Sequence, residues 1–208
     1  NTAQMYFEQA ISIDPSDADA IFNLATVLEK FQKQNDAMLL YQKSIQINPM
    51  MLNARNNLGN ILMENGNDRE AVFQFRTILD MHPNDWYALT NLGHIYFKKG
   101  HMSEARVLYK KALLNSTKQA SLYYSLALLE MRCKNTSEAV RYFKQTLMYQ
   151  PSNKKAHNNL GVLFASLGQS NKAKYHFHEA LRIDDTYEEA RKNLEVISNH
   201  KQVSDVSL

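Results

Sequence analysis

The sequence contains few of the residues that build disulfide scaffolds, β-turns or membrane spans. Its one cysteine, Cys133, excludes an internal disulfide and a metal site made of paired thiolates. Six glycines and four prolines among 208 residues are too few for a turn-rich β fold and favour helices. No apolar run approaches the roughly 18 residues that cross a bilayer, so we expect no direct membrane insertion in this segment.

An excess of one charge and the common catalytic motifs are also missing. The chain has 24 basic and 21 acidic residues, and a net charge of +3 gives no reason to expect nucleic acid as a partner. The seven histidines are scattered without zinc-binding spacing. There is no glycine-rich phosphate loop and no nucleophile elbow. We therefore predict a protein that is not an enzyme and that holds no cofactor and no metal.

The main feature that the sequence does contain is a pattern that repeats every 34 residues. A proline or its equivalent recurs at Pro15, Pro49, Pro83, Thr117, Pro151 and Asp185. A leucine recurs at Leu24, Leu58, Leu92, Leu126 and Leu160, and a small residue follows it at Ala25, Gly59, Gly93, Ala127 and Gly161. Later in each unit an alanine recurs at Ala37, Ala71, Ala105, Ala139 and Ala173, with an aromatic residue four places further on at Tyr41, Phe75, Tyr109, Phe143 and Phe177.

This spacing predicts two helices in each unit. The apolar residues of the first stretch return at helical intervals, and a glycine or a polar turn closes the stretch at Gly66, Gly100 and Gly168. Small residues let two helices approach closely, and proline ends the second helix because it lacks an N–H. One helix pair cannot bury its own apolar face, so neighbouring pairs must stack into a continuous core.

The pattern resembles the tetratricopeptide repeat family. The resemblance implies an all-α fold, a right-handed superhelix or solenoid of helix-turn-helix repeats. Five full repeats fit, at 18–51, 52–85, 86–119, 120–153 and 154–187. Residues 3–17 resemble the second half of an earlier repeat, and residues 188–199 resemble a capping helix. We expect a single array over 1–199, and a disordered tail over 200–208 because periodicity is lost there.

Two departures from the pattern fall in the fourth repeat. Glu130 stands where the other repeats have an apolar residue, and Lys134 stands where the turn between the helices usually has glycine. The third repeat also ends in Thr117 without proline. We therefore expect looser packing or a slight change of superhelical angle around 117–135.

In this family the first helices line an inner groove, and the residue before each core leucine faces it. Those residues are Asn23, Asn57, Asn91, Ser125 and Asn159. The resemblance places further side chains on the same face, among them Asn56, Asn60, Tyr87, His94, Tyr124 and Asn158. An amide both donates and accepts hydrogen bonds, so a column of asparagines can pair with the backbone of an extended peptide. The array is similar to the asparagine ladder of O-linked N-acetylglucosamine transferase. Asparagines at this site can equally bond a neighbouring helix.

Two glycosylation sequons leave the compartment open. Asn115 and Asn135 each begin one, and both fall in predicted turns where an acceptor would be exposed. The sequence begins at Asn1 without an initiator methionine, so we expect a piece of a longer protein. The cytoplasm is the first expectation, and the endoplasmic reticulum lumen, as part of a membrane protein, is the alternative.

The prediction for function is a non-enzymatic scaffold that binds a protein or an extended peptide in the groove. One alternative is the non-catalytic, substrate-presenting repeat domain of a larger glycosyltransferase. The repeats and the junction without proline are similar to those of the transmembrane O-mannosyltransferases, whose repeats lie in the lumen. A second alternative is a structural subunit that self-assembles, which keeps a homo-oligomer possible.

Overall fold

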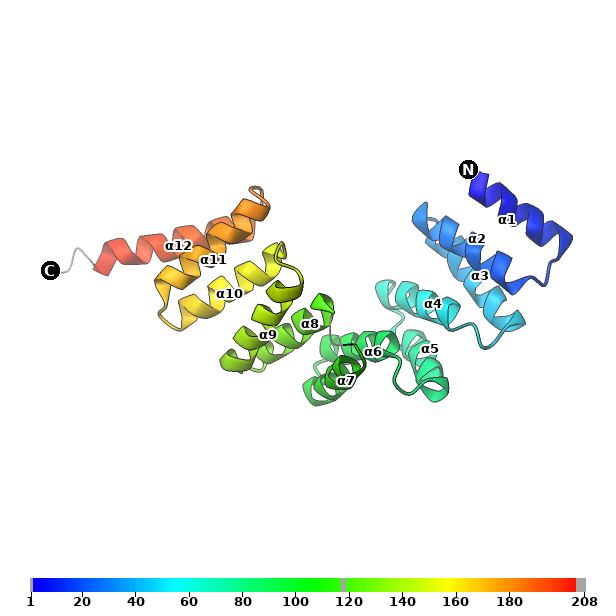
Figure 1. Cartoon of the computed structure of the whole chain (residues 1–208), viewed down its shortest axis with the longest axis horizontal. Coiled ribbons are helices and arrows are strands. Elements are labelled where there is room, and N and C mark those ends of the chain that lie inside the picture. Colours follow the sequence, from blue (N-terminus) through cyan, green and yellow to red (C-terminus); the bar gives the residue numbers. More distant parts are fainter. Residues whose placement is uncertain (1, 117–118, 205–208) are drawn as a thin grey trace. The chain divides into compact units, whose positions relative to one another are not determined.

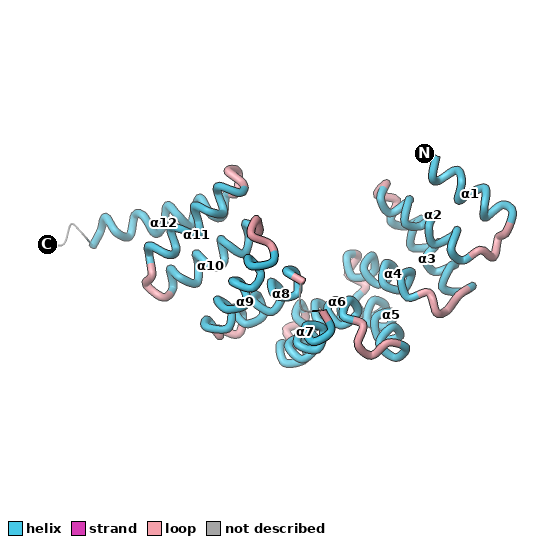
Figure 2. Tube along the Cα trace, viewed as in Figure 1, coloured by secondary structure: helices cyan, strands magenta, loops and turns pink. Residues whose placement is uncertain are grey.

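A computed structural model describes residues 2–116 and 119–204 of the chain (Figure 1). Within these ranges the secondary structure is helix and turn, with no strand (Figure 2). The helices form two compact units, residues 1–115 and 116–208. The all-α fold built of repeated helix pairs is therefore confirmed. Since the chain divides into two units, a single array over 1–199 stays a prediction.

The first unit holds seven helices among the described residues, in three complete pairs that follow one unpaired helix. Their bounds are α1 Thr2–Ile13, α2 Ala18–Lys30, α3 Gln34–Ile47, α4 Leu52–Glu64, α5 Asp68–Met81, α6 Trp86–Lys98 and α7 Met102–Asn115. Each pair agrees with one predicted repeat. α1 corresponds to the predicted half repeat.

The second unit holds two complete pairs and a final helix among its described residues. Their bounds are α8 Ala120–Arg132, α9 Thr136–Tyr149, α10 Lys154–Ser166, α11 Ser170–Ile183 and α12 Glu188–Ser204. The capping helix was expected to end at 199, but α12 continues through 200–204, which the sequence had assigned to the tail. The remaining tail residues, 205–208, lie outside the described residues.

Helix starts follow local side-chain chemistry. Asp17, Asp85 and Asn153 each accept a hydrogen bond from the backbone N–H three residues later, at 2.9, 2.7 and 2.9 Å. This N-cap satisfies one of the donors that the first turn of a helix leaves without a partner. The caps begin α2, α6 and α10, so three of the first helices have a fixed starting residue.

Within each repeat, the core forms where a small residue of the first helix contacts the aromatic ring of the second helix. Phe75 and Tyr109 are buried, and a Cβ placed on Gly59 or Gly93 would come within 2.7 or 2.6 Å of their rings. Glycine is therefore required for this approach, unless the ring shifts. Ala25 and Ala127 occupy the same place in repeats one and four, so a methyl group is the largest side chain found there.

The predicted loosening near the fourth repeat is not seen in the described part of that segment. Leu122, Leu126 and Leu129 of α8 are fully buried. Glu130 is also buried, and its carboxylate accepts a hydrogen bond of 2.6 Å from the Asn135 side chain. Because the buried carboxylate is satisfied, it does not force the helices apart. Thr117 lies outside the described residues.

Candidate functional site

In the first unit, the predicted groove residues lie on α2, α4 and α6, the first helices of their pairs. The structure brings Asn56 and Asn57 of α4 and Tyr87 of α6 together around one hollow of about 310 Å³. Phe22, Asn53 and Asp85 complete its lining. Phe22 and Asn53 belong to the predicted face, but Asp85 was not expected. Its position before the first residue of α6 could have indicated it.

The wall residues of this hollow are held in place by contacts outside it. The Asp85 carboxylate caps α6 through the Ala88 N–H, at 2.7 Å. The Tyr87 ring contacts Trp86 edge-on, with 5.2 Å between centroids, and the Phe22 ring lies 5.8 Å from Tyr41. The hollow therefore has a largely preformed polar and aromatic lining.

The Asn56 side chain is the unusual polar group of the hollow. Its Oδ1 atom is buried and accepts no hydrogen bond. A buried acceptor without a partner costs roughly 1–3 kcal/mol, and native proteins contain few of them. Asn56 is also one of the residues that line the hollow.

The neighbouring asparagines of the first unit already bond other helices. Asn57 Nδ2 donates to Tyr41 Oη of α3 at 2.9 Å, and that hydroxyl donates to Glu29 at 2.6 Å. Burial, together with the hydrogen bond to Glu29, raises the pKa of Tyr41 above its ordinary value. Asn91 Nδ2 donates to Asn60 Oδ1 at 2.7 Å, which links α6 to α4. These amides therefore tie successive repeats together.

The second unit repeats this arrangement. Asn159 Nδ2 donates to Tyr124 Oη at 3.3 Å, and Asn193 Nδ2 donates to Asn158 Oδ1 at 3.0 Å. Asn158 was expected to face a ligand, but its side chain is only 7% exposed. Its amide oxygen serves the contact between α10 and α12. Burial raises the pKa of Tyr124, whose ring packs edge-on against Phe143.

Two other predicted residues occupy different surroundings. Asn23 of α2 is partly exposed and does not line the hollow. The His94 ring packs edge-on against Tyr109, with 5.5 Å between centroids, and burial lowers the pKa of His94. His94 therefore stays neutral at pH 7 and contributes to the packing of α6 against α7.

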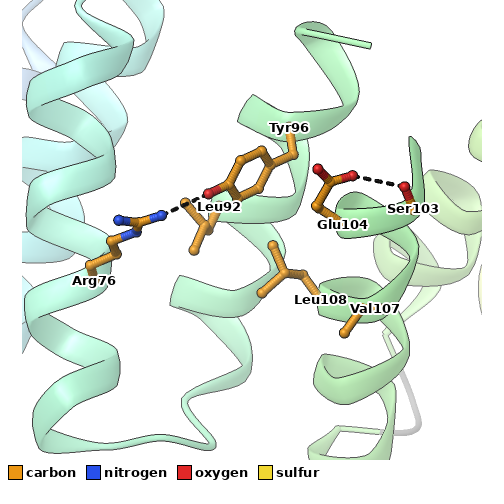
Figure 3. Close-up of a pocket in the computed structure, with 7 residues that line it drawn as sticks. All are labelled: Arg76, Leu92, Tyr96, Ser103, Glu104, Val107 and Leu108. Carbon is orange, nitrogen blue, oxygen red and sulfur yellow. Dashed lines mark hydrogen bonds between the residues drawn. The ribbon is translucent and has the colours of Figure 1, made fainter. Parts of the chain in front are cut away.

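A larger hollow of about 450 Å³ lies between α5 and α7, over α6, and was not predicted (Figure 3). Leu92, Val107 and Leu108 make its apolar part. At its edge, Arg76 Nη2 donates to Tyr96 Oη at 2.8 Å, as Figure 3 shows. No sequence signal marks this hollow, because it depends on how side chains of α5, α6 and α7 pack against one another in space.

The two sequon asparagines are exposed, and both make local hydrogen bonds. Asn115 Nδ2 donates to the Lys111 carbonyl at 2.8 Å, and Asn135 Nδ2 donates to Glu130 at 2.6 Å. A glycosylated amide keeps one N–H, so neither contact decides whether the site is used. The luminal alternative stays a prediction.

The described residues offer neither a cluster of metal-binding side chains nor a membrane-spanning helix. Among the residues whose positions are described, no three His, Cys, Asp or Glu side chains gather around a possible metal position. Within the same part of the chain, every helix is too short or too polar to traverse a bilayer.

Family models match most of the chain. Two models described as tetratricopeptide repeat match residues 6–38 and 154–187, and the second match coincides with the last full repeat predicted above. A model described as the TT21 fifth ARM repeats domain matches residues 53–159, a little over half of the chain. Comparison with curated proteins found no match. The more specific resemblances to glycosyltransferase repeats are not confirmed.

Solved structures with the same fold are similar at low sequence identity. A chain of the APC/C hetero-tetramer Cut9–Hcn1 shares 20% identity with a TM-score of 0.81, and the match covers 93% of this chain and 38% of that one. This chain thus spans little more than a third of that relative. PilF of Pseudomonas aeruginosa gives 21% identity and a TM-score of 0.79, covering 89% of this chain and 85% of that one. YrrB, described as a TPR protein with an unusual peptide-binding site, gives 20% sequence identity and a TM-score of 0.68. The match covers 89% of this chain and 96% of that one.

Proposed function

Because the chain belongs to the tetratricopeptide repeat family, and its residues 53–159 to the family of the TT21 fifth ARM repeats domain, we propose that it is a non-enzymatic interaction scaffold. Its ligand is an extended peptide segment of another protein. The first-helix face of the first unit, centred on the hollow between Phe22 and Tyr87, receives that segment. The fold is consistent with such a scaffold, and repeats of this kind are generally not catalytic.

The observation that carries this proposal is the buried Asn56 Oδ1 atom without a hydrogen-bond partner. A rotation of the Asn56 side chain would bring this oxygen to the surface of the hollow. An extended peptide presents one N–H at every residue, so its backbone would then supply the missing donor whatever its side chains are. Phe22 and Tyr87 stand beside the amide and give an apolar side chain of the ligand a surface to contact. Asn57 and Asn91 donate to neighbouring helices and keep their oxygens as further acceptors.

The test uses a displayed library of extended dodecapeptides selected on the wild-type chain, followed by affinity measurement on the Asn56→Leu variant. Leucine has a similar size and no acceptor, so a buried acceptor without a partner is removed and the fold is retained. A ligand N–H that loses its acceptor should weaken binding about tenfold or more, which is ~1.4 kcal/mol.

The matched control is Asn65→Ala, which changes an exposed asparagine in the turn after α4. Selected peptides should bind this variant with wild-type affinity. Equal affinity for wild type and Asn56→Leu would contradict the proposed site. A selection that returns no binding peptide would contradict the proposed function.

A further inference from the structure

The hollow between α5 and α7, here named the α5–α7 hollow, has an apolar floor and one exposed apolar wall. Leu92 of α6 forms the floor and is only 4% exposed, whereas Val107 of α7 is 66% exposed. Leu108 lies beside Val107 and is half-buried. The α5–α7 hollow shares no residue with the hollow of the proposed function. An apolar side chain that entered it would remove this apolar surface from water, which is favourable.

Opposite charges stand on the two walls of the α5–α7 hollow. Figure 3 shows Arg76 of α5 and Glu104 of α7 on opposite sides of the Tyr96 ring. Each is held by a neutral hydroxyl, since Arg76 Nη2 donates to Tyr96 Oη at 2.8 Å and Ser103 Oγ donates to Glu104 at 2.9 Å. Hydrogen bonds from its own backbone N–H and from Ser103 lower the pKa of Glu104, so this carboxylate is charged at neutral pH.

The two charged groups are both available to a ligand. Arg76 and Glu104 lie in the described part of the chain and do not form an ion pair with each other. A guanidinium has five N–H donors, so Arg76 keeps further donors beside the one that Tyr96 accepts. Glu104 also has His101 Nδ1 at 3.4 Å, a contact at the exposed end of α7. The α5–α7 hollow therefore presents a cation, an apolar floor and an anion in that order.

Repeat five shows how the same place is filled by the chain itself. The equivalent of Tyr96 there is Phe164, which stacks on His176 with 5.4 Å between centroids. Lys172 stands in the place of Glu104, and its Nζ atom lies 5.5 Å from the centroid of the Phe164 ring. In repeat three a leucine replaces the histidine and a carboxylate replaces the lysine, so the equivalent space is open.

We propose that the α5–α7 hollow docks a segment of a partner protein in which an apolar side chain stands between an acidic and a basic residue. The apolar side chain covers Leu92 and Val107. The acidic residue pairs with Arg76, and the basic residue pairs with Glu104. A ligand with a single charge would leave one wall without a counter-charge, so charge complementarity selects a segment that carries both signs. This proposal does not depend on the proposed function.

The experiment selects displayed dodecapeptides on the Asn56→Leu chain, so that ligands of the other hollow are disfavoured. Peptides are retained when Val107→Glu abolishes their binding, because this change places a charge in the apolar wall. Leu39→Glu is the matched control, since Leu39 has the same place in its repeat on α3 and is 62% exposed. Retained peptides should bind wild type and Leu39→Glu equally, and they should share an apolar residue between an acidic and a basic one.

A charge exchange tests the roles of the two walls. The double variant Arg76→Glu, Glu104→Arg keeps the net charge of the chain and turns both expected attractions into repulsions. Both residues are exposed, so the fold should be retained. The double variant should bind each retained peptide about tenfold more weakly or worse. A peptide whose acidic and basic residues are exchanged should recover affinity for the double variant, because each charge again faces its opposite.

Four results would overturn the proposal. Selection could return no peptide that requires Val107, the double variant could bind the retained peptides as well as wild type does, or the exchanged peptide could fail to recover affinity. A dimer in light scattering that Val107→Glu abolishes and Leu39→Glu preserves would make a second copy the occupant. Because Asn56 does not line the α5–α7 hollow, each of these results leaves the test of the proposed function unaffected.

Discussion

Lys134 and Gln32 show what a turn position demands of a single residue. Both adopt the left-handed conformation with φ of 60°, at the place where the other repeats have Gly66, Gly100 and Gly168. The turn is closed by Asn135 N–H donating to the Glu130 carbonyl at 2.8 Å, and Lys33 N–H does the same to Leu28 at 3.0 Å. The hydrogen-bonding pattern of the turn is therefore the same without glycine. The cost is the steric clash of the Cβ atom with the backbone at positive φ.

Lys134→Gly is expected to stabilise the second unit by about 0.5–1 kcal/mol. Glycine removes the Cβ clash of the left-handed conformation, and the greater freedom of the unfolded chain offsets part of the gain. Urea unfolding at neutral pH measures the difference. Lys134→Ala shortens the side chain but keeps the Cβ, so it should give no such gain. A gain from alanine equal to that from glycine would contradict this explanation.

The pairing of α10 with α11 depends on two histidines that are neutral in the fold. His157 Nδ1 lies 3.1 Å from His176 Nδ1, and His157 Nε2 lies 3.2 Å from the Pro151 carbonyl. A carbonyl only accepts, so His157 carries its proton on Nε2 and accepts from His176 through Nδ1. Burial lowers the pKa of His157, and burial with the nearby His157 and Lys144 lowers the pKa of His176 to about 4.

The stability of the second unit should therefore fall as the pH drops from about 6.5 to about 4. Over that range histidine in the unfolded chain takes up a proton, while His176 in the folded chain does not. The unfolded state gains protons first, so acid favours unfolding, by an amount on the order of 2 kcal/mol. Urea unfolding across that pH range measures the slope.

His176→Gln should reduce this pH dependence, because it removes one of the two histidines whose pKa is lowered in the folded state, the one lowered to about 4. His178→Gln, on the same helix at an exposed position, should keep the wild-type slope. Identical slopes for the two variants would show that the histidine pair does not cause the effect.

At the scale of the whole molecule, charge is nearly balanced and the proposed ligand face is largely neutral. The net charge is +3, and the predicted face is made mainly of amides and aromatic rings. Ion pairs exist elsewhere on the surface, as between Arg141 and Glu138 at 2.6 Å, where solvent screens them. Recognition should therefore depend on hydrogen bonds and ring contacts.

The affinity for a peptide selected on the wild-type chain should change less than about threefold between ~50 mM and ~500 mM salt. Screening weakens exposed charge pairs strongly and buried hydrogen bonds little. Fluorescence anisotropy at both salt concentrations measures the ratio. A loss of affinity of tenfold or more would show that charge attracts the ligand.

The repeat pattern predicted most of the fold because its causes are local or recur along the chain. The positions of Gly59 and Phe75 are 16 residues apart in one hairpin, and the same contact is specified again at Gly93 and Tyr109. The turn after α4 at Gly66 and the start of α6 at Asp85 follow from the backbone and capping chemistry of adjacent residues. Such features need no knowledge of distant residues, so the sequence by itself determined the helix pairs, their phase and the family.

Only the tertiary structure decided which of the predicted groove residues form hydrogen bonds within the protein, and with which partners. Asn158 and Asn159 bond residues 35 places away, and Asn91 bonds one 31 places away. The sequence could not distinguish these amides from Asn56, since all share the same helix face. The Asn56 oxygen without a hydrogen-bond partner and the buried but satisfied Glu130 both depend on which groups the neighbouring helices supply. A hydrogen bond or a covered face requires a partner in space, and its position exists only once the helices have packed.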